Sequence, residues 1–107
     1  MFVNVRERAQ FRPERLARVG LFEVPQLFLD LYCLEPGQEQ RPHVHADAAK
    51  IYYVLEGEGT FLVGGETRRL GPGHAVLAPA GSEHGVRNDG GGRVQLLVMM
   101  APNPNAP

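Results

Sequence analysis

Residues 37–57 read GQEQRPHVHADAAKIYYVLEG, and residues 73–88 read GHAVLAPAGSEHGVRN. The first stretch carries His43 and His45, two positions apart, and the second carries His84 shortly after a Pro-Ala-Gly turn. Alternate residues of a strand point to the same face, so the first two imidazoles are expected to project together. The turn ahead of His84 can bring a third imidazole beside them. The two stretches therefore predict one site built from two separate parts of the chain.

Strand-like periodicity surrounds both stretches. In residues 26–34, QLFLDLYCL, side chains alternate with period two until the turn at Glu35-Pro36-Gly37, which is typical of a strand with one better-buried face. The other predicted strands are residues 41–45, 50–55, 59–63, 67–70, 75–78, 85–87 and 94–100. Turns containing glycine or proline separate many of them. This pattern predicts an all-β sandwich or closed barrel, with a single helical turn that begins at Pro13.

The spacing of the glycines, histidines and proline resembles the cupin superfamily. The first motif is Gly37-x5-His43-x-His45 closed by Gly57, and the second is Gly73-x5-Pro79-x-Gly81-x2-His84-x3-Asn88. The resemblance covers roughly residues 30–100 and implies a double-stranded β-helix, a jelly-roll barrel of two antiparallel sheets. One position departs from the pattern, because Lys50 stands where the first motif carries a metal-binding glutamate.

We expect one domain with three parts, since 107 residues suffice for a single core. Residues 1–25 are expected to supply an N-terminal strand and the short helical turn, packed on the barrel. Residues 26–100 form the barrel itself. Residues 101–107 are rich in proline, which cannot donate to a sheet, and are expected to be a disordered tail.

Composition narrows the classes of partner and the compartment. A net charge of −1 and scattered arginines argue against a nucleic-acid partner, which calls for a basic face. No apolar run is long enough to span a bilayer, and the N-terminus lacks the apolar core of a signal peptide. The single cysteine excludes an internal disulfide, so we predict a cytoplasmic protein.

The three histidines predict a metal site. Neutral imidazoles that converge on one point suit zinc, iron, nickel or copper and leave positions open for water or a substrate. We expect a divalent ion, with manganese also among the candidates, on His43, His45 and His84. The alternative is a polar pocket that holds no metal.

Lys50 complicates that prediction. It is the only lysine among 11 lysine and arginine residues, and the cupin pattern places it in the same cavity as the histidines. An ammonium cannot ligate a metal, and a nearby divalent cation repels it. Lys50 therefore swings away, replaces the metal as the positive charge for an anionic ligand, or acts as a general acid or base. A further alternative is a lysine that extends to solvent at the barrel mouth.

Other residues are weaker candidates. Tyr52 shares the strand face of Lys50 and is a candidate for proton transfer. Asp47 continues the alternation of 43 and 45, although a surface-loop aspartate is the simpler interpretation. His74 lies beside a turn glycine and is expected to be exposed. One face of the last strand, which is either pocket lining or core, carries Gln95, Leu97 and Met99.

Two functional hypotheses follow, because a third, a purely structural or interaction protein, leaves three converging histidines unexplained. In the first, the chain is a small metal-dependent cupin that acts on a small organic metabolite, as a dioxygenase, isomerase or cyclase, with Lys50 and Tyr52 as catalytic residues. In the second, it binds a small anion or sugar without turnover, and Lys50 is the charge partner. The resemblance also implies a homodimer, for which residues 2, 3, 5, 11, 21 and 22 supply spare apolar surface.

Overall fold

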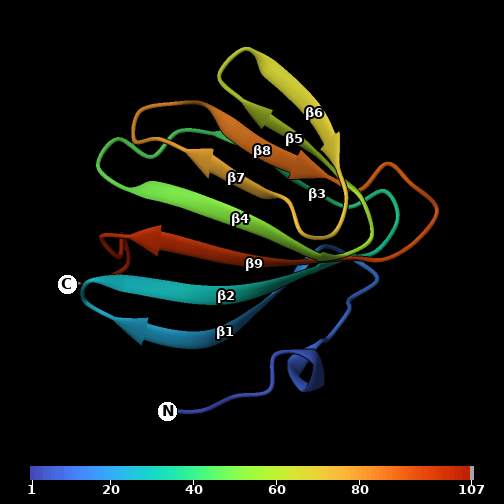
Figure 1. Ribbon diagram of the computed structural model, residues 1–107, viewed down its shortest axis with the longest axis horizontal. Coiled ribbons are helices and arrows are strands. Elements are labelled where there is room, and N and C mark those ends of the chain that lie inside the picture. The colour runs from blue at the N-terminus through green and yellow to red at the C-terminus, as the bar shows by residue number, and fades with distance from the viewer. Residues whose placement is uncertain (107) are drawn as a thin grey trace.

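The computed structural model describes residues 1–106 and consists of two antiparallel sheets that face each other (Figure 1). The five-stranded sheet has the order β1-β2-β9-β4-β7, with bounds Ala17–Val24, Leu27–Leu34, Val94–Ala101, Ala49–Glu56 and Ala75–Ala78. The four-stranded sheet has the order β3-β8-β5-β6, with bounds Glu39–His43, His84–Arg87, Gly59–Val63 and Glu66–Leu70. The prediction of an all-β jelly-roll barrel is confirmed.

The main core lies between the two sheets. Strand β9 shows how the sequence creates it, because its residues alternate strictly between buried and half-buried positions. Val94, Leu96, Val98 and Met100 point inward, and the period of two follows from the pleat. The same inner cluster takes side chains from both sheets, among them Phe28, Leu34, Val54, Phe61 and Val86. This assigns Gln95, Leu97 and Met99 to the outer face, so they belong neither to the pocket lining nor to the main core, the two alternatives that the sequence left open.

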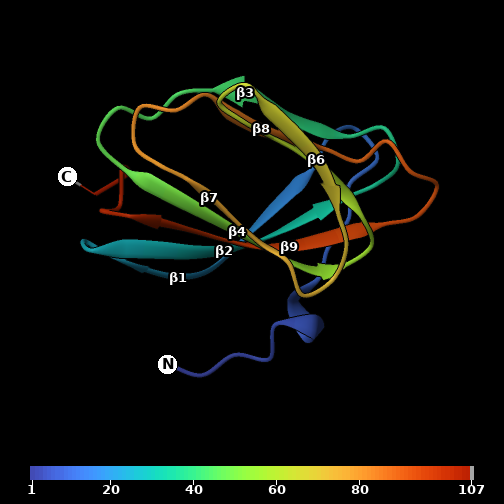
Figure 2. The ribbon, with the colours of Figure 1, turned by 45° about the horizontal axis from the view of Figure 1, so that its top comes forward.

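A second apolar cluster covers part of the outer face of the five-stranded sheet. Ala17, Val19, Leu31 and Cys33 are buried there beneath Val5, Ala9 and Phe11 from the N-terminal segment. Figure 2 shows this segment on the side of the sheet that faces away from the four-stranded sheet. Its only helical element among the described residues is the 3-10 helix η1, Arg6–Arg8.

The predicted helical turn at Pro13 is not found; residues 13–15 form a bend instead. A proline can begin a helix but does not by itself supply the bonds that continue it. The turn forms at residues 6–8, where the Asn4 side-chain oxygen accepts a hydrogen bond from the Glu7 amide at 3.3 Å. Such an acceptor satisfies a backbone amide that a helix start leaves free.

The C-terminal segment returns to the barrel. Ala101 still pairs with Ala49 in the sheet. Asn103 is buried, and its side-chain amide donates to the Val24 carbonyl at 3.0 Å. The segment that we expected to be a free tail is thus held to the β1–β2 turn through residue 103, while residue 107 lies outside the described residues.

Gly57, the last glycine of the first motif, ends strand β4 at a place where no other residue fits. Its φ is 75°, a left-handed value that L-residues adopt rarely. A Cβ atom built on Gly57 would collide with the carbonyl oxygen of Arg93. The spacing of the motif therefore has a steric cause in the contact between this turn and the start of β9.

Candidate metal centre and adjoining cavity

A β-bulge aims His43 at the site. In the pairing of β3 with β8, Gln40 lies opposite Val86 and His43 lies opposite His84. Three steps along β3 thus match two steps along β8, which is the offset of one extra residue. The extra residue puts both Gln40 and His43 on the inner face. In a regular strand, two residues three positions apart would point to opposite faces.

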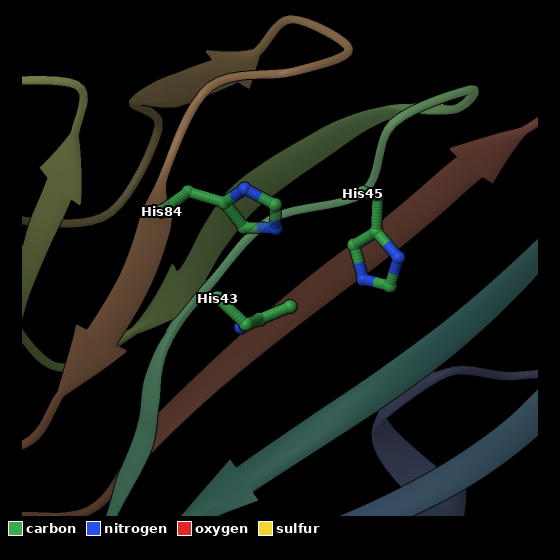
Figure 3. Close-up of side chains that lie close together, drawn as sticks. All are labelled: His43, His45 and His84. Atoms are coloured by element: carbon green, nitrogen blue, oxygen red, sulfur yellow. The ribbon is translucent and has the colours of Figure 1, made fainter.

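The three predicted histidines come together in this structure. Figure 3 shows His43 at the end of β3, His45 in the loop that follows and His84 at the start of β8. One nitrogen from each ring lies within 4.8 Å of the others. The ring centroids of His43 and His84 are 4.3 Å apart, and those of His43 and His45 are 4.8 Å apart. His45 was predicted on a strand; it reaches the cluster from a loop instead, since β3 ends at His43.

Backbone carbonyls orient two of these rings. Nδ1 of His43 lies 2.8 Å from the Arg41 carbonyl oxygen, and Nδ1 of His84 lies 3.0 Å from the Ser82 carbonyl oxygen. A carbonyl only accepts, so each Nδ1 carries the proton and each Nε2 keeps a lone pair. Nε2 of His84 is buried and has no hydrogen-bond partner among the described residues.

The environment favours the neutral form of His84 and His45. Burial lowers the pKa of His84, and the neighbouring His43, Lys50 and His45 add to the effect against the Ser82 carbonyl bond. Burial also lowers the pKa of His45, with His43 and Lys50 contributing. Neutral imidazoles are the form that ligates a metal.

Lys50 lies fully buried beside the cluster. Its Nζ donates to Oε1 of Gln40 at 3.0 Å, and the Tyr52 hydroxyl donates to the same oxygen at 2.7 Å. The Gln40 amide nitrogen donates in turn to the Tyr32 hydroxyl at 3.1 Å. Nζ of Lys50 also lies 5.0 Å from the centre of the Tyr52 ring and 5.4 Å from that of Tyr32. One glutamine side chain thus connects a lysine and two tyrosines.

Burial changes the acidity of this group of residues. Burial, with a smaller contribution from the charge of Arg18 and against the opposing effect of Asp30, lowers the pKa of Lys50 to about 7. Burial raises the pKa of Tyr52 far above its usual range, so the Tyr52 hydroxyl stays protonated. Lys50 is consequently the member of the group that exchanges a proton near neutral pH.

A cavity of about 590 Å³ joins His43 and His45 to Lys50. Its walls carry charges of both signs together with apolar residues. The charged or ionisable ones are Arg18, Asp30, Tyr32, Glu39, Arg41, His43, His45 and Lys50. Lys50 does not extend to solvent, because only 1% of it is exposed. Tyr52 shares the inner face of β4 but is not part of the cavity wall. Asp47 and His74 are exposed, and neither lines this cavity.

Sequence reasoning missed Gln40, Tyr32 and Arg18. Tyr32 and Arg18 pair across β1 and β2 and so share a face; the alternation of residues 26–34 already put Tyr32 and Asp30 on one side. Gln40 gave no such signal, because the bulge that turns it inward cannot be recognised from residue types alone.

The fold and the site together define a class of protein: a β barrel of two sheets with a histidine cluster between them. The chain belongs to the cupin family, since the family model for the cupin domain matches residues 30–100.

Several known proteins are similar to it. An oxalate-binding protein of Thermotoga maritima is 30% identical over 67 residues, which are 63% of this chain and 55% of that protein. A 5-nitrosalicylic acid 1,2-dioxygenase of a Bradyrhizobium species is 34% identical over 71 residues, which are 66% of this chain and 34% of that protein. The chain therefore spans less than two thirds of either relative. The crystal structure of TT1209 from Thermus thermophilus matches with a TM-score of 0.94 and 44% identity, over 96% of this chain and 98% of that one.

The described residues include no helix with the length and hydrophobicity needed to cross a bilayer.

Proposed function

We propose that the chain holds one divalent metal ion on His43, His45 and His84 and acts on a small organic molecule in the adjoining cavity. The observation that carries this proposal is the buried Nε2 of His84, which has a lone pair and no partner among the described residues. A buried polar atom without a partner is costly, and a metal ion would satisfy it.

The donor set fits such an ion. Each histidine offers a nitrogen, and the carbonyl bonds at Nδ1 of His43 and His84 leave Nε2 of both rings free to ligate. Nitrogen ligands lie about 2.1 Å from zinc, so two of them on one ion are within ~4.2 Å of each other. The nitrogens here lie within 4.8 Å, so small ring rotations would close the cluster. When bound, the ion supplies Lewis acidity to a ligand oxygen.

In the enzymatic form of the proposal, Lys50 is the catalytic acid or base. Its pKa of about 7 lets it gain or lose a proton near neutral pH, and it lines the cavity in which a substrate would lie. Tyr52 acts through Gln40 as a positioning residue, because its hydroxyl donates to the same oxygen as Lys50. The similarity to a dioxygenase supports turnover of a small organic substrate.

The second candidate function is binding without turnover. It is favoured by the cationic side chains of the cavity, Arg18, Arg41 and Lys50, and by the similarity to an oxalate-binding protein. In this case the ligand is a small carboxylate, and Lys50 supplies the charge that holds it.

We also propose that the protein is a cytoplasmic homodimer. The cytoplasmic address rests on the single cysteine. Part of the apolar surface predicted for the dimer is not available, because Val5, Phe11 and Leu21 pack on the second cluster of the same chain. The proposal therefore rests on the remaining outer face of the five-stranded sheet, where Tyr53 and Leu77 are exposed.

The metal site is tested by elemental analysis of protein purified without a histidine tag. Replacement of His43, His45 or His84 by alanine should each remove most of the bound metal. The matched control is His74→Ala, since His74 is exposed and lies outside the cavity. Equal loss in all four variants, or loss in none, would contradict the assignment.

Turnover and binding are separated by a second measurement on the same protein. Oxalate is titrated into the metal-loaded protein by calorimetry, and its concentration is then followed over time. Heat of binding with no consumption favours the binding function, whereas consumption that is lost in Lys50→Gln favours the enzyme.

A further inference from the structure

Lys50 is a buried amine without a counter-ion. It forms no ion pair with a carboxylate among the described residues, whose salt bridges all involve arginine. Asp30 and Arg18 act on it from a distance and in opposite directions. An isolated buried ammonium is unfavourable, so the side chain is suited to its neutral form.

The hydrogen bonds around Lys50 favour the same form. An ammonium has three N–H donors, but Nζ has one acceptor here, Oε1 of Gln40, which also accepts from Tyr52. A neutral amine that donates once to Gln40 keeps its lone pair for the cavity that Lys50 lines. A lone pair on a buried amine is a nucleophile.

The cavity places this nucleophile near the histidine cluster. Lys50, His43 and His45 line the same walls, and the charge of Lys50 lowers the pKa of both His45 and His84. A protonated lysine at this place opposes a divalent ion. A carboxylate at the same place would attract the ion and add an oxygen to its nitrogen ligands.

We propose that Lys50 is a carbon dioxide acceptor, and that the resulting carbamate supplies the anionic oxygen which the histidine cluster lacks. The Nζ lone pair forms a bond to the carbon of CO2, and one C–O π pair moves to oxygen. The nitrogen then loses a proton to water, so that R-NH2 and CO2 give R-NH-COO⁻ and H⁺. The reaction needs no oxidant or reductant.

The cavity offers partners to the new anion. Arg18 lies close enough to lower the pKa of Lys50 by its charge, and it lines the cavity together with Arg41. Guanidinium groups bind carboxylates well. The chemistry at Lys50 does not need a metal, whereas the role of the carbamate as a ligand rests on the metal site proposed above.

The single lysine allows a direct test. The intact protein is labelled with [ε-15N]lysine, placed in a mildly alkaline buffer with 13C-bicarbonate, and studied by 13C NMR. A carbamate on Lys50 gives a carbonyl signal that the bonded 15N splits into a doublet. An α-amine at the start of the chain carries no 15N, so its carbamate would be a singlet and serves as an internal control. We expect the doublet.

A second measurement tests the ligand role. Zinc is titrated by calorimetry with and without bicarbonate, and bicarbonate should tighten binding by about tenfold or more in the parent. Lys50→Gln should show no such effect, and its melting transition confirms that it folds. Absence of the doublet overturns the carbamate and leaves a three-histidine metal site standing. A doublet in a protein that binds no zinc overturns the metal site and not the carbamate.

Discussion

At the scale of single residues, Gln40 determines what Lys50 and Tyr52 can do. Its side-chain oxygen, Oε1, accepts hydrogen bonds from both side chains, and its side-chain nitrogen, Nε2, donates one to the Tyr32 hydroxyl. The hydroxyl of Tyr52 is committed to this bond and stays protonated, while the amine of Lys50 reaches the cavity. Lys50, which stands where the motif carries a glutamate, is therefore a buried weak base and not an exposed cation.

Lys50→Glu should bind zinc or nickel more tightly than the parent in buffer free of carbon dioxide. The substitution exchanges a repelling charge for an oxygen ligand, and the gain should be about one to a few kcal/mol at this position. Calorimetric titration of the metal measures it. Lys50→Gln removes the charge without adding an anion and should lie between the two proteins. If Lys50→Glu binds no better than the parent, the amine does not face the metal site.

The stability of the parent should depend on pH through Lys50. The folded pKa is about 7 against an ordinary value of 10.5, so between these values the unfolded chain binds the proton and the folded chain does not. The free energy of unfolding therefore rises with pH between these two values. As the pH falls towards 7, the same contribution is lost. Compared with Lys50→Met, the parent should gain on the order of a few kcal/mol from pH 7 to 10.5.

Urea unfolding of both proteins at several pH values measures this difference, and the comparison cancels the groups that both share. Parallel stability curves would show that the lysine keeps its ordinary pKa.

At the scale of elements, the β3–β8 pair carries the geometry of the site. The bulge needs a close approach of the two backbones, and Gly85 permits it. A Cβ atom at Gly85 would lie 2.8 Å from the backbone carbonyl oxygen of Gln40 and 3.0 Å from the backbone nitrogen of Pro42. Neither atom belongs to a flexible side chain, so the strands themselves would have to separate. Such a separation would displace His43 and His84 from each other.

Gly85→Ala should therefore destabilise the fold by about 1–3 kcal/mol, as overpacking does, and weaken metal binding at the same time. Gly91→Ala is the matched control, because a Cβ atom there meets nothing within 4 Å. Chemical unfolding and a zinc titration check the two effects. Wild-type stability and zinc affinity in Gly85→Ala would show that the bulge does not position the histidines.

At the scale of the whole molecule, the five-stranded sheet has an apolar outer face that the N-terminal segment covers only in part. The register places Ile51 opposite Leu77 and Met99, and Tyr53 opposite Leu97. Leu77 is 57% exposed and Tyr53 is 39% exposed. Neighbouring apolar side chains of this kind mark a surface that a partner covers, and two copies can cover it by facing each other.

Light scattering coupled to size-exclusion chromatography should therefore show a dimer. Leu77→Glu should shift the equilibrium to the monomer, because it places a charge in the middle of an apolar contact. Val44→Glu is the control, since Val44 is equally exposed but lies in the loop after β3. A parent protein that runs as a monomer would contradict the proposed dimer.

The sequence by itself determined the sheet architecture and the meeting of the three histidines. Alternation in strands and glycine or proline in turns are local signals, and they suffice for elements such as β2 and β9. The assembly of His43, His45 and His84 followed from motif spacing, although His45 lies outside a strand. The helical turn predicted at Pro13 is not found, because a proline that can begin a helix does not by itself supply the hydrogen bonds that continue it.

Only the tertiary structure decided the surroundings of Lys50. The groups around it come from Arg18 on β1, Tyr32 on β2 and Gln40 on β3, and these strands meet Lys50 only when both sheets are assembled. Burial sets the pKa of the amine, and burial is a property of packing that no spacing of residues contains. Packing also determines that Leu97 and Met99 point outward, because the other side of β9 faces the four-stranded sheet.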